Sequence, residues 1–318
     1  MYKYFMRLLS GFFLVFGLSA PIILNAGDSS PIPEWCRKLP RPVYKTLKRV
    51  LPEDPWFEVY EVRPGIFAIY EPHQIEEVIS YLITGKSRAL LLDTGMGIAS
   101  IKKVVAQLTS LPVVVLNTHT HPDHVGGNAE FSEIWAIDTD YTRAHAAQGF
   151  MDPAMKDWVS PPNVCGLPPE GFQPESYRIQ PFKITRYVKD REVIDLGGCA
   201  LQVLRTPGHA PDAICLYDAA NRLLFSGDSY YPGPIYLFVK ETDLPAYMHS
   251  VEEIAALTGK LDAVLPSHNE PLAKPEVLPR LLQAVKAIQS GSTSYTVIEG
   301  LRKYTFEGFS ILVADKQK

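Results

Sequence analysis

Short apolar runs separated by turn residues predict two sets of β-strands along the chain. The runs carry β-branched and aromatic residues, and Pro-Gly, Gly-Lys, Gly-Gly and Asn turns divide them, which is typical of antiparallel strands. In the first half we expect strands at 57–62, 66–70, 78–84 and 89–93. In the second half we expect them at 193–196, 201–206, 213–217 and 223–226.

A helical period follows each set of strands, and a further apolar run completes each half. We expect helices at 98–108, 244–257 and 276–289, and strands at 113–116 and 263–265. Both halves therefore have the same order of strands, helix and a final apolar strand. Neither half should bury its sheet alone, so we predict one α/β domain over 56–318, a four-layer αββα sandwich.

Two segments lack this regularity. Residues 138–190 hold many Pro and Gly residues and no clear period, apart from a possible short helix at 141–148, and we interpret them as a specificity insertion. Residues 27–55 are rich in Pro, Ser and charge, and we interpret them as an N-terminal arm.

The first residues have the layout of a signal peptide. Lys3 and Arg7 precede an uncharged apolar stretch at 8–26, with a cleavage point expected after Ala26. The stretch is also long enough to remain as an uncleaved anchor. We therefore expect a periplasmic or secreted protein, or one tethered to the membrane through this segment and facing outward.

Composition and charge narrow the possible partners. Hydrophobic residues make up 46% and charged residues 21% of the 318 residues, which fits a globular protein with a substantial core. The net charge is −4, and no basic stripe or long Lys/Arg run is present. Without such a basic surface we do not expect the protein to bind nucleic acid, and a small molecule is the expected partner. The oligomeric state stays open.

The four cysteines give no catalytic signal. They are Cys36, Cys165, Cys199 and Cys215, and none stands in a Cys-x-x-Cys arrangement. Export would permit disulfides without specifying them. Cys199 and Cys215 fall beside or inside strand-like runs, where a buried free thiol is the commoner state.

The densest group of metal-ligand residues directly follows the apolar run 113–116. It comprises His119, His121, Asp123 and His124. A loop at a strand end can aim the first two side chains to one side, and Pro122 then redirects the chain for the other two. Imidazole nitrogen and carboxylate oxygen suit Zn²⁺, and also Fe or Mn.

Three more ligand-type residues follow later strand-like runs. They are His209, Asp228 and His268. A lone loop histidine is usually only a polar surface residue, but seven such residues at strand ends can fill two metal sites of four to five ligands if a water also bridges them. The sequence therefore predicts two divalent metal ions, with zinc preferred.

The motif His-x-His-x-Asp-His, followed by a distant His, Asp and His, resembles that of the metallo-β-lactamase-fold superfamily of hydrolases. The resemblance covers about 66–271. It implies one metal on His119, His121 and His209, a second on Asp123, His124 and His268, and a bridging Asp228. It also implies that Asp93 supports the ligand-bearing loops from behind.

The motif is specific for fold and metal but weak for substrate, because the superfamily includes glyoxalase II-like thioesterases, lactonases, phosphodiesterases, sulfatases and true β-lactamases. True metallo-β-lactamases lack the bridging aspartate, so Asp228 favours an ester, thioester or lactone. A β-lactamase or a phosphodiesterase acting at the same site is the alternative. A non-catalytic metal-binding protein is the alternative of another class, and a redox protein with two irons ranks last because it would need a flavin domain.

Two residues are expected to act with the metals. Asp123 would orient a metal-bridging hydroxide for attack on the carbonyl. Tyr231 stands three residues after the bridging aspartate and resembles a lactonase tyrosine that points at the substrate carbonyl, although packing is the ordinary role of such a residue. Of the remaining histidines, His145 and His249 are expected in the core or at the surface, and His73 could line the cleft.

Overall fold

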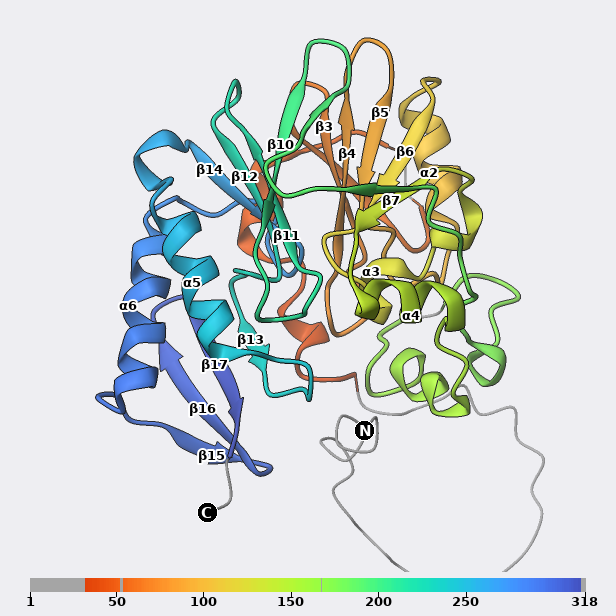
Figure 1. Ribbon diagram of the computed structural model, residues 1–318. Helices are drawn as coiled ribbons and strands as arrows, with labels where there is room; N and C mark the ends of the chain where they lie inside the picture. Colours follow the sequence, from red (N-terminus) through yellow and green to blue (C-terminus); the bar gives the residue numbers. More distant parts are fainter. Residues whose placement is uncertain (1–31, 52–53, 167, 316–318) are drawn as a thin grey trace, which may run out of the picture.

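The structure, a computed structural model, describes residues 32–51, 54–166 and 168–315. Two large β-sheets lie face to face, with helices on both outer faces (Figure 1). The predicted signal peptide at 1–26 lies outside the described residues. In the part of the chain that is described, every helix is too short or too polar to span a bilayer.

The first sheet has eight strands in chain order. They are β1 (Lys48–Arg49), β2 (Glu58–Arg63), β3 (Ile66–Tyr70), β4 (Ile79–Thr84), β5 (Ala89–Leu92), β6 (Val113–Leu116), β7 (Ile134–Ile137) and β8 (Arg186–Val188). Pairing is antiparallel from β1 to β5 and parallel from β5 to β8. The strands predicted in the first half therefore form this sheet, while β1, β7 and β8 were not predicted.

The second sheet has the order β14-β12-β11-β10-β9. Its strands are β9 (Val193–Asp195), β10 (Ala200–Arg205), β11 (Ile214–Asp218), β12 (Leu223–Gly227) and β14 (Ala263–Pro266). Only β12 and β14 pair in parallel. All five strands correspond to predicted ones, with ends that differ by at most one residue.

A third, four-stranded sheet has the order β13-β17-β16-β15 and was not predicted. Its strands are β13 (Pro234–Leu237), β15 (Thr296–Ile298), β16 (Leu301–Phe306) and β17 (Phe309–Ala314). The strand β15 is exposed along its length and β16 is mostly half-buried, so neither has the apolar run that marks a core strand. Parallel pairing joins β13 to the distant β17.

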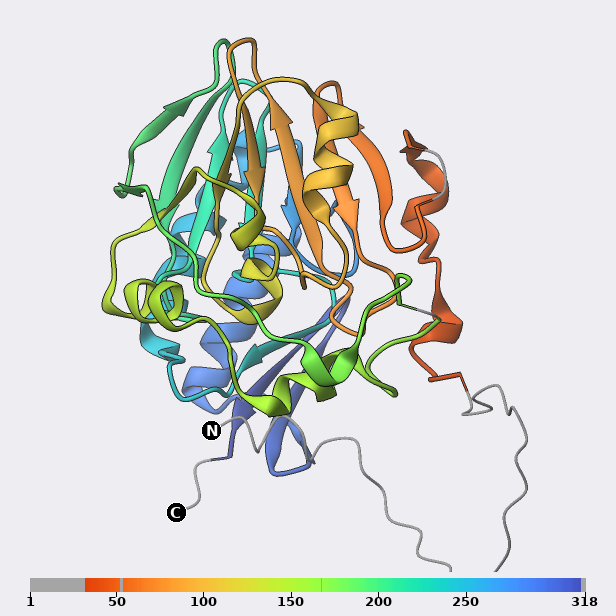
Figure 2. The ribbon, with the colours of Figure 1, turned by 90° about the vertical axis from the view of Figure 1, so that its right-hand side faces the viewer.

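The described residues contain five α-helices, three of which begin at a side-chain cap. The five are α2 (Ile101–Leu108), α3 (Pro122–Val125), α4 (Asp140–Gln148), α5 (Leu244–Ala255) and α6 (Val277–Ser290). The side chains of Ser100, Thr139 and Asp243 accept hydrogen bonds from backbone amides in the first turns of α2, α4 and α5. Figure 2 faces the side of the molecule on which α2 covers the first sheet.

Three apolar clusters separate the four layers. Tyr81 of β4 and Phe225 of β12 meet edge to face at 5.3 Å between the two sheets. Leu91 packs with α2 on the outer face of the first sheet, and Leu224 packs with α5 and α6 on the outer face of the second. The predicted αββα sandwich is confirmed in this layering.

The N-terminal arm takes part in this packing over its described residues. Two 3₁₀-helices, η2 (Cys36–Lys38) and η3 (Pro42–Thr46), precede β1. Tyr44 is 3% exposed and stacks on Tyr70 of β3 at 4.3 Å. The fold was expected to begin near Trp56, but it already includes the arm. Tyr44 is the only buried residue of 32–51, which is too little to mark this segment as part of the core.

The segment 138–190 begins with α4 and ends in β8, so it returns to the first sheet. The 3₁₀-helices η5 (Pro153–Val159) and η6 (Pro174–Ser176) lie between them. Trp158 and Phe182 pack into the apolar cluster on the outer face of that sheet. A disulfide joins Cys165 of this segment to Cys36 of the arm, while Cys199 and Cys215 are free thiols.

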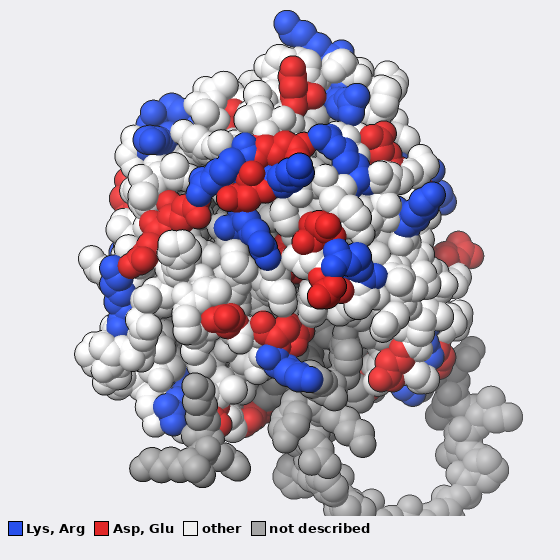
Figure 3. Space-filling view, viewed as in Figure 1, with Lys and Arg blue, Asp and Glu red and all other residues white. Residues whose placement is uncertain are grey.

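Charged side chains of both signs are interspersed on the face of the molecule seen in Figure 1. Figure 3 shows lysine and arginine next to aspartate and glutamate there, with no stripe of one sign. The described residues also form exposed ion pairs between opposite charges, such as that of Arg222 with Asp262. This face therefore lacks the continuous basic surface that binding to a phosphate backbone requires.

Candidate metal centre

All seven predicted ligands lie at one end of the two large sheets. His119 and His121 follow β6, and Asp123 and His124 belong to α3. The other three follow strands of the second sheet: His209 after β10, Asp228 after β12 and His268 after β14. The strands β10, β12 and β14 run in one direction, so their carboxyl ends bring these three loops together.

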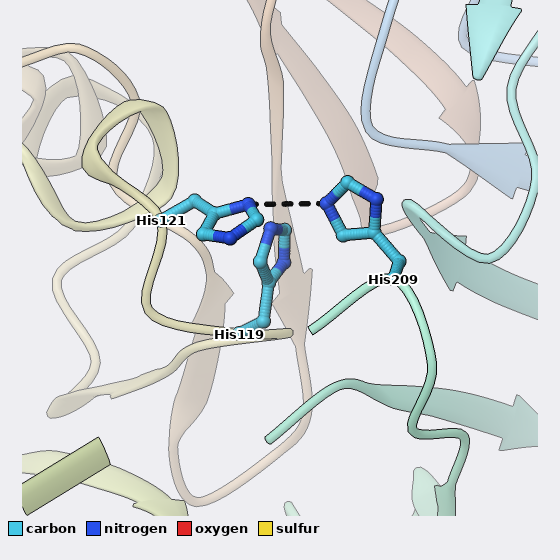
Figure 4. A group of neighbouring side chains, drawn as sticks. All are labelled: His119, His121 and His209. Atoms are coloured by element: carbon cyan, nitrogen blue, oxygen red, sulfur yellow. Dashed lines mark hydrogen bonds between the residues drawn. The ribbon is translucent and has the colours of Figure 1, made fainter. Parts of the chain in front are cut away.

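The first group consists of His119, His121 and His209. Their candidate ligand atoms lie within 4.8 Å of one another, and His209 Nε2 is 3.1 Å from His121 Nδ1. Figure 4 shows the three rings turned toward one another from two separate loops. Three imidazoles at this separation can serve as three ligands of one metal.

The second group consists of Asp123, His124 and His268, also with ligand atoms within 4.8 Å of one another. His124 Nε2 and His268 Nε2 are 3.3 Å apart. Asp228 lies between the groups: Oδ2 is 3.4 Å from His209 Nε2, and Oδ1 is 3.1 Å from His268 Nε2. One carboxylate therefore offers an oxygen atom to each group.

Hydrogen bonds on the far side of three rings fix which nitrogen faces the site. His209 Nδ1 lies 2.9 Å from the carbonyl oxygen of Tyr236, and His268 Nδ1 lies 2.7 Å from that of Glu76. Because a carbonyl oxygen only accepts, both Nδ1 atoms donate, and each Nε2 faces the site as the nitrogen that can bind a metal when the ring is neutral. Asp93 Oδ2 lies 2.9 Å from His124 Nδ1 and accepts its hydrogen bond in the same way, so His124 also turns its Nε2 toward the site.

Asp93 also holds the loop that carries the first two ligands. Its Oδ1 accepts from the Thr118 backbone amide at 2.7 Å, and its Oδ2 accepts from the Thr118 hydroxyl at 2.8 Å. Asp93 is fully buried behind the ligands. The structure thus places Asp93 where the resemblance implies, in contact with ligand-bearing residues and out of reach of a metal between them.

Burial and the facing charges set the protonation of the ligands. Burial lowers the pKa of His209 to about 4 and holds the pKa of His119 well below its ordinary value. Burial alone would raise the pKa of Asp228, but the facing rings of His268 and His124 outweigh it and hold that pKa well below the ordinary value. Burial alone would lower the pKa of His268, but the facing Asp228 carboxylate outweighs it and raises that pKa to about 9. Neutral imidazoles bind metal, so a metal bound by the second group must displace the proton that this carboxylate stabilises.

Two buried atoms in the described part of the site lack hydrogen-bond partners, His119 Nε2 and Asp228 Oδ1. Asp228 Oδ1 is close to His268 Nε2 but accepts no hydrogen bond from it. An unsatisfied buried polar group costs on the order of 1–3 kcal/mol, so such atoms need a partner. Coordination to a cation would supply one for each, and the donor set therefore fits two divalent metals.

A cavity of about 700 Å³ opens beside the two groups. Its wall is largely aromatic: Tyr141, Trp158, Tyr231, Tyr236 and Phe238 line it. Glu76, His145, Lys240 and Glu241 add polar groups. A wide apolar space beside a polar, metal-binding floor suits a substrate that carries a bulky apolar group next to its reacting bond.

Tyr231 lies in the cavity wall, but its hydroxyl is already engaged. The ring is 4.8 Å from the His268 ring. Its hydroxyl donates to the Pro234 carbonyl at 2.7 Å and accepts from the Tyr236 amide at 3.2 Å. A bond to a substrate carbonyl would require this donation to break, so the geometry favours packing over the catalytic role predicted for this tyrosine.

Sequence analysis missed several residues of the cavity. Tyr236 and Phe238 belong to or follow β13, a strand that was not predicted. His145 was expected in the core or at the surface, yet it lines the cavity with Nδ1 held 2.8 Å from the Thr120 carbonyl. His73 packs beside Trp56 and is not among the residues that line the cavity, and His249 is exposed.

Comparisons with known proteins agree with this arrangement. Residues 77–268 match the family model of the metallo-beta-lactamase superfamily. The human acyl-coenzyme A thioesterase MBLAC2 is 27% identical over 231 residues, which cover 67% of this chain and 81% of that protein. The linear primary-alkylsulfatase of a Pseudomonas species is 24% identical, with coverage of 64% and 44%.

Solved structures support the fold alone. A metallo-beta-lactamase family protein from Thermus thermophilus has a TM-score of 0.51 and 22% identity, and the match covers 73% of this chain and 82% of that one. The sec-alkylsulfatase Pisa1 from a Pseudomonas species has a TM-score of 0.56 and 17% identity, with coverage of 73% and 41%. At these identities the activities of the two proteins say nothing about the substrate of this chain.

Proposed function

We propose that this chain, which belongs to the metallo-beta-lactamase superfamily and is a metal-dependent hydrolase, uses two divalent metals to cleave thioesters with an apolar acyl group. One observation carries the proposal: the Asp228 carboxylate lies between two groups of ligand-type side chains, with one oxygen toward each. Zinc suits the histidine-rich donor set, and iron or manganese would also fit.

The first group, His119, His121 and His209, would hold one metal, and the second, Asp123, His124 and His268, would hold the other. Two metals bound there would supply a hydroxide nucleophile at neutral pH and Lewis acidity toward the carbonyl oxygen. In the reaction a carbon–oxygen bond forms, the carbon–sulfur bond breaks, and the thiolate leaves and takes up a proton.

Asp123 would orient the nucleophile. Its Oδ2 is 3.4 Å from His124 Nε2 and 3.6 Å from His268 Nε2, and the carboxylate also lines the cavity. The neighbouring histidines outweigh the effect of burial and lower the pKa of Asp123 to about 2. The group is therefore ionised at neutral pH and can accept a hydrogen bond from the attacking oxygen.

The aromatic cavity wall supports the choice of substrate. Burial of apolar surface contributes roughly 25 cal/mol per Å², so a long acyl chain gains more from this wall than a compact polar substrate does. The relatives named as acyl-coenzyme A thioesterases favour the same bond type. Esters and lactones share the reaction geometry and remain secondary substrates.

A substrate panel tests the proposal. The purified zinc-loaded protein is assayed with acyl-coenzyme A thioesters of several chain lengths, acyl-homoserine lactones, aryl phosphodiesters and a β-lactam. We expect the largest kcat/KM on a thioester of medium or long chain. A dominant response to the β-lactam or the phosphodiester would contradict the proposal, and no turnover of any class would favour a metal-binding protein without catalysis.

Replacing Phe238 with alanine should impair long acyl substrates selectively. Phe238 lines the cavity, and loss of its contact should raise KM for a long-chain thioester about tenfold, which corresponds to roughly 1.5 kcal/mol of apolar burial. KM for the acetyl thioester should stay nearly unchanged. Phe172→Ala is the matched control, because Phe172 packs outside the cavity. An equal change for both chain lengths would contradict an acyl-binding wall.

We also propose that the protein is exported. The Cys36–Cys165 disulfide is typical of an oxidising compartment and supports the signal peptide predicted at 1–26. We expect the mature protein to begin near Gly27 in the periplasm, or to stay tethered outside the inner membrane. Cell fractionation with amino-terminal sequencing measures this. An intact amino terminus on soluble cytoplasmic protein would reject the idea.

A further inference from the structure

Arg41 of the N-terminal arm makes a fork of hydrogen bonds behind the second ligand group. Its Nε donates to Glu77 Oε2 at 2.7 Å, and its terminal nitrogen Nη2 donates to Glu77 Oε1 at 2.5 Å and to Asn269 Oδ1 at 2.7 Å. Arg41 thus links three segments that are distant in sequence. It lies outside residues 77–268, which match the family model.

Both partners of Arg41 adjoin groups that hold His268. Asn269 directly follows His268 in the chain, and its backbone amide donates to the Glu77 carbonyl at 3.0 Å. Glu76, next to Glu77, accepts from His268 Nδ1 through its carbonyl at 2.7 Å. A shift of either partner would therefore turn the His268 ring or release its Nδ1 proton from the carbonyl that fixes its orientation.

The local backbone needs this outside support. Glu77 has φ +46° and Asn269 has φ +68°, in the left-handed region that L residues disfavour. The Glu77 side chain is only 4% exposed, so its charge must be compensated within the protein. Arg41 supplies the positive charge, and the Tyr70 hydroxyl donates to Glu77 Oε2 at 2.5 Å.

The arm that delivers Arg41 is fixed on both sides. Before it, Cys36 is joined by a disulfide to Cys165, and Trp35 Nε1 donates to the Pro162 carbonyl at 3.0 Å. After it, Tyr44 stacks on Tyr70. A guanidinium on a fixed segment can position its partners, because little side-chain freedom remains to be lost in making the fork.

We propose that Arg41 is a positioning residue that holds His268 in place as a ligand of the second metal. The inference rests on the proposed two-metal site. It predicts a selective effect: loss of the fork should weaken the metal bound by Asp123, His124 and His268 and leave the metal bound by His119, His121 and His209 nearly unchanged.

The test measures the affinity of each zinc equivalent in the full mature protein by competition with a chromophoric chelator. In Arg41→Gln we expect one equivalent to bind 10- to 100-fold more weakly, the range typical for loss of a residue that orients a metal ligand, and the other to change less than about twofold. Arg49→Gln is the matched control on the same arm, since Arg49 only faces Glu58 at 3.6 Å, and should bind both equivalents normally.

Arg41→Lys separates charge from geometry. Lysine keeps the charge but presents its donors from a single nitrogen and lacks the planar fork that matches the Glu77 carboxylate and Asn269, so we expect an intermediate and equally selective loss. If the glutamine variant is recovered unfolded, as judged by circular dichroism, the lysine variant carries the test. Unchanged binding, or equal weakening of both equivalents, would overturn the positioning role. A wild-type protein that binds only one equivalent would instead reject the proposed two-metal function.

Discussion

Replacing Asp228 with alanine should reduce kcat/KM for a thioester by at least about 1,000-fold, beyond the roughly 100- to 1,000-fold that follows removal of a single oxyanion donor. The reason is geometric. Asp228 offers one oxygen to the side of His209 and the other to the side of His268, so its loss removes a ligand from both groups at once. Steady-state kinetics on the zinc-loaded variant measures the effect, and zinc binding should fall in parallel.

The activity of Tyr231→Phe is the comparison for Asp228→Ala, because both side chains line the cavity but only Asp228 is a candidate metal ligand. The Tyr231 hydroxyl donates to the Pro234 carbonyl, so its removal should cost about 1 kcal/mol of structural hydrogen bonding and less than a tenfold change in activity. A loss of 100-fold or more on lactones would instead assign the tyrosine to the substrate carbonyl. Near-normal activity of Asp228→Ala would reject the bridging role of that carboxylate.

Removal of metal should abolish hydrolysis completely and reversibly. After dialysis against a strong chelator we expect no turnover, because the nucleophile and the Lewis acid are both lost. When zinc is added back, activity should rise as the second equivalent binds. Elemental analysis should then give about two metals per chain. Full activity at one equivalent, after metal has been added back, would contradict the two-metal mechanism. Iron and manganese added in the same way identify the preferred metal.

The metal ligands could be predicted from the sequence because their signal is local. His119, His121, Asp123 and His124 are close in the chain, and His209, Asp228 and His268 each lie in the loop after an apolar strand. Strand ends are the positions where a sandwich of two sheets brings loops together. Local apolar runs likewise explain why the strands of the two large sheets other than β1, β7 and β8 were predicted to within one residue at each end.

Other features depend on contacts that no local pattern encodes. The sheet of β13 and β15–β17 joins strands far apart in sequence, and its strands β15 and β16 are too exposed to have an apolar period. Arg41 donates hydrogen bonds to Glu77 and Asn269, which are 36 and 228 residues away in the sequence. The position of the Tyr231 hydroxyl likewise depended on β13, so the sequence allowed a catalytic role that the fold disfavours.

The Cys36–Cys165 disulfide turns more than a third of the described chain into a closed covalent ring, with a sequence separation of 129 residues. His119, His121, Asp123 and His124 lie inside the ring, and His209, Asp228 and His268 lie beyond it. A single protease cut inside the ring leaves both fragments tethered. Closing a loop of this length also restricts the unfolded chain, by about 5 kcal/mol in the chain-entropy model. A reductant should therefore lower the free energy of unfolding, and fragments cut inside the ring should separate only after reduction.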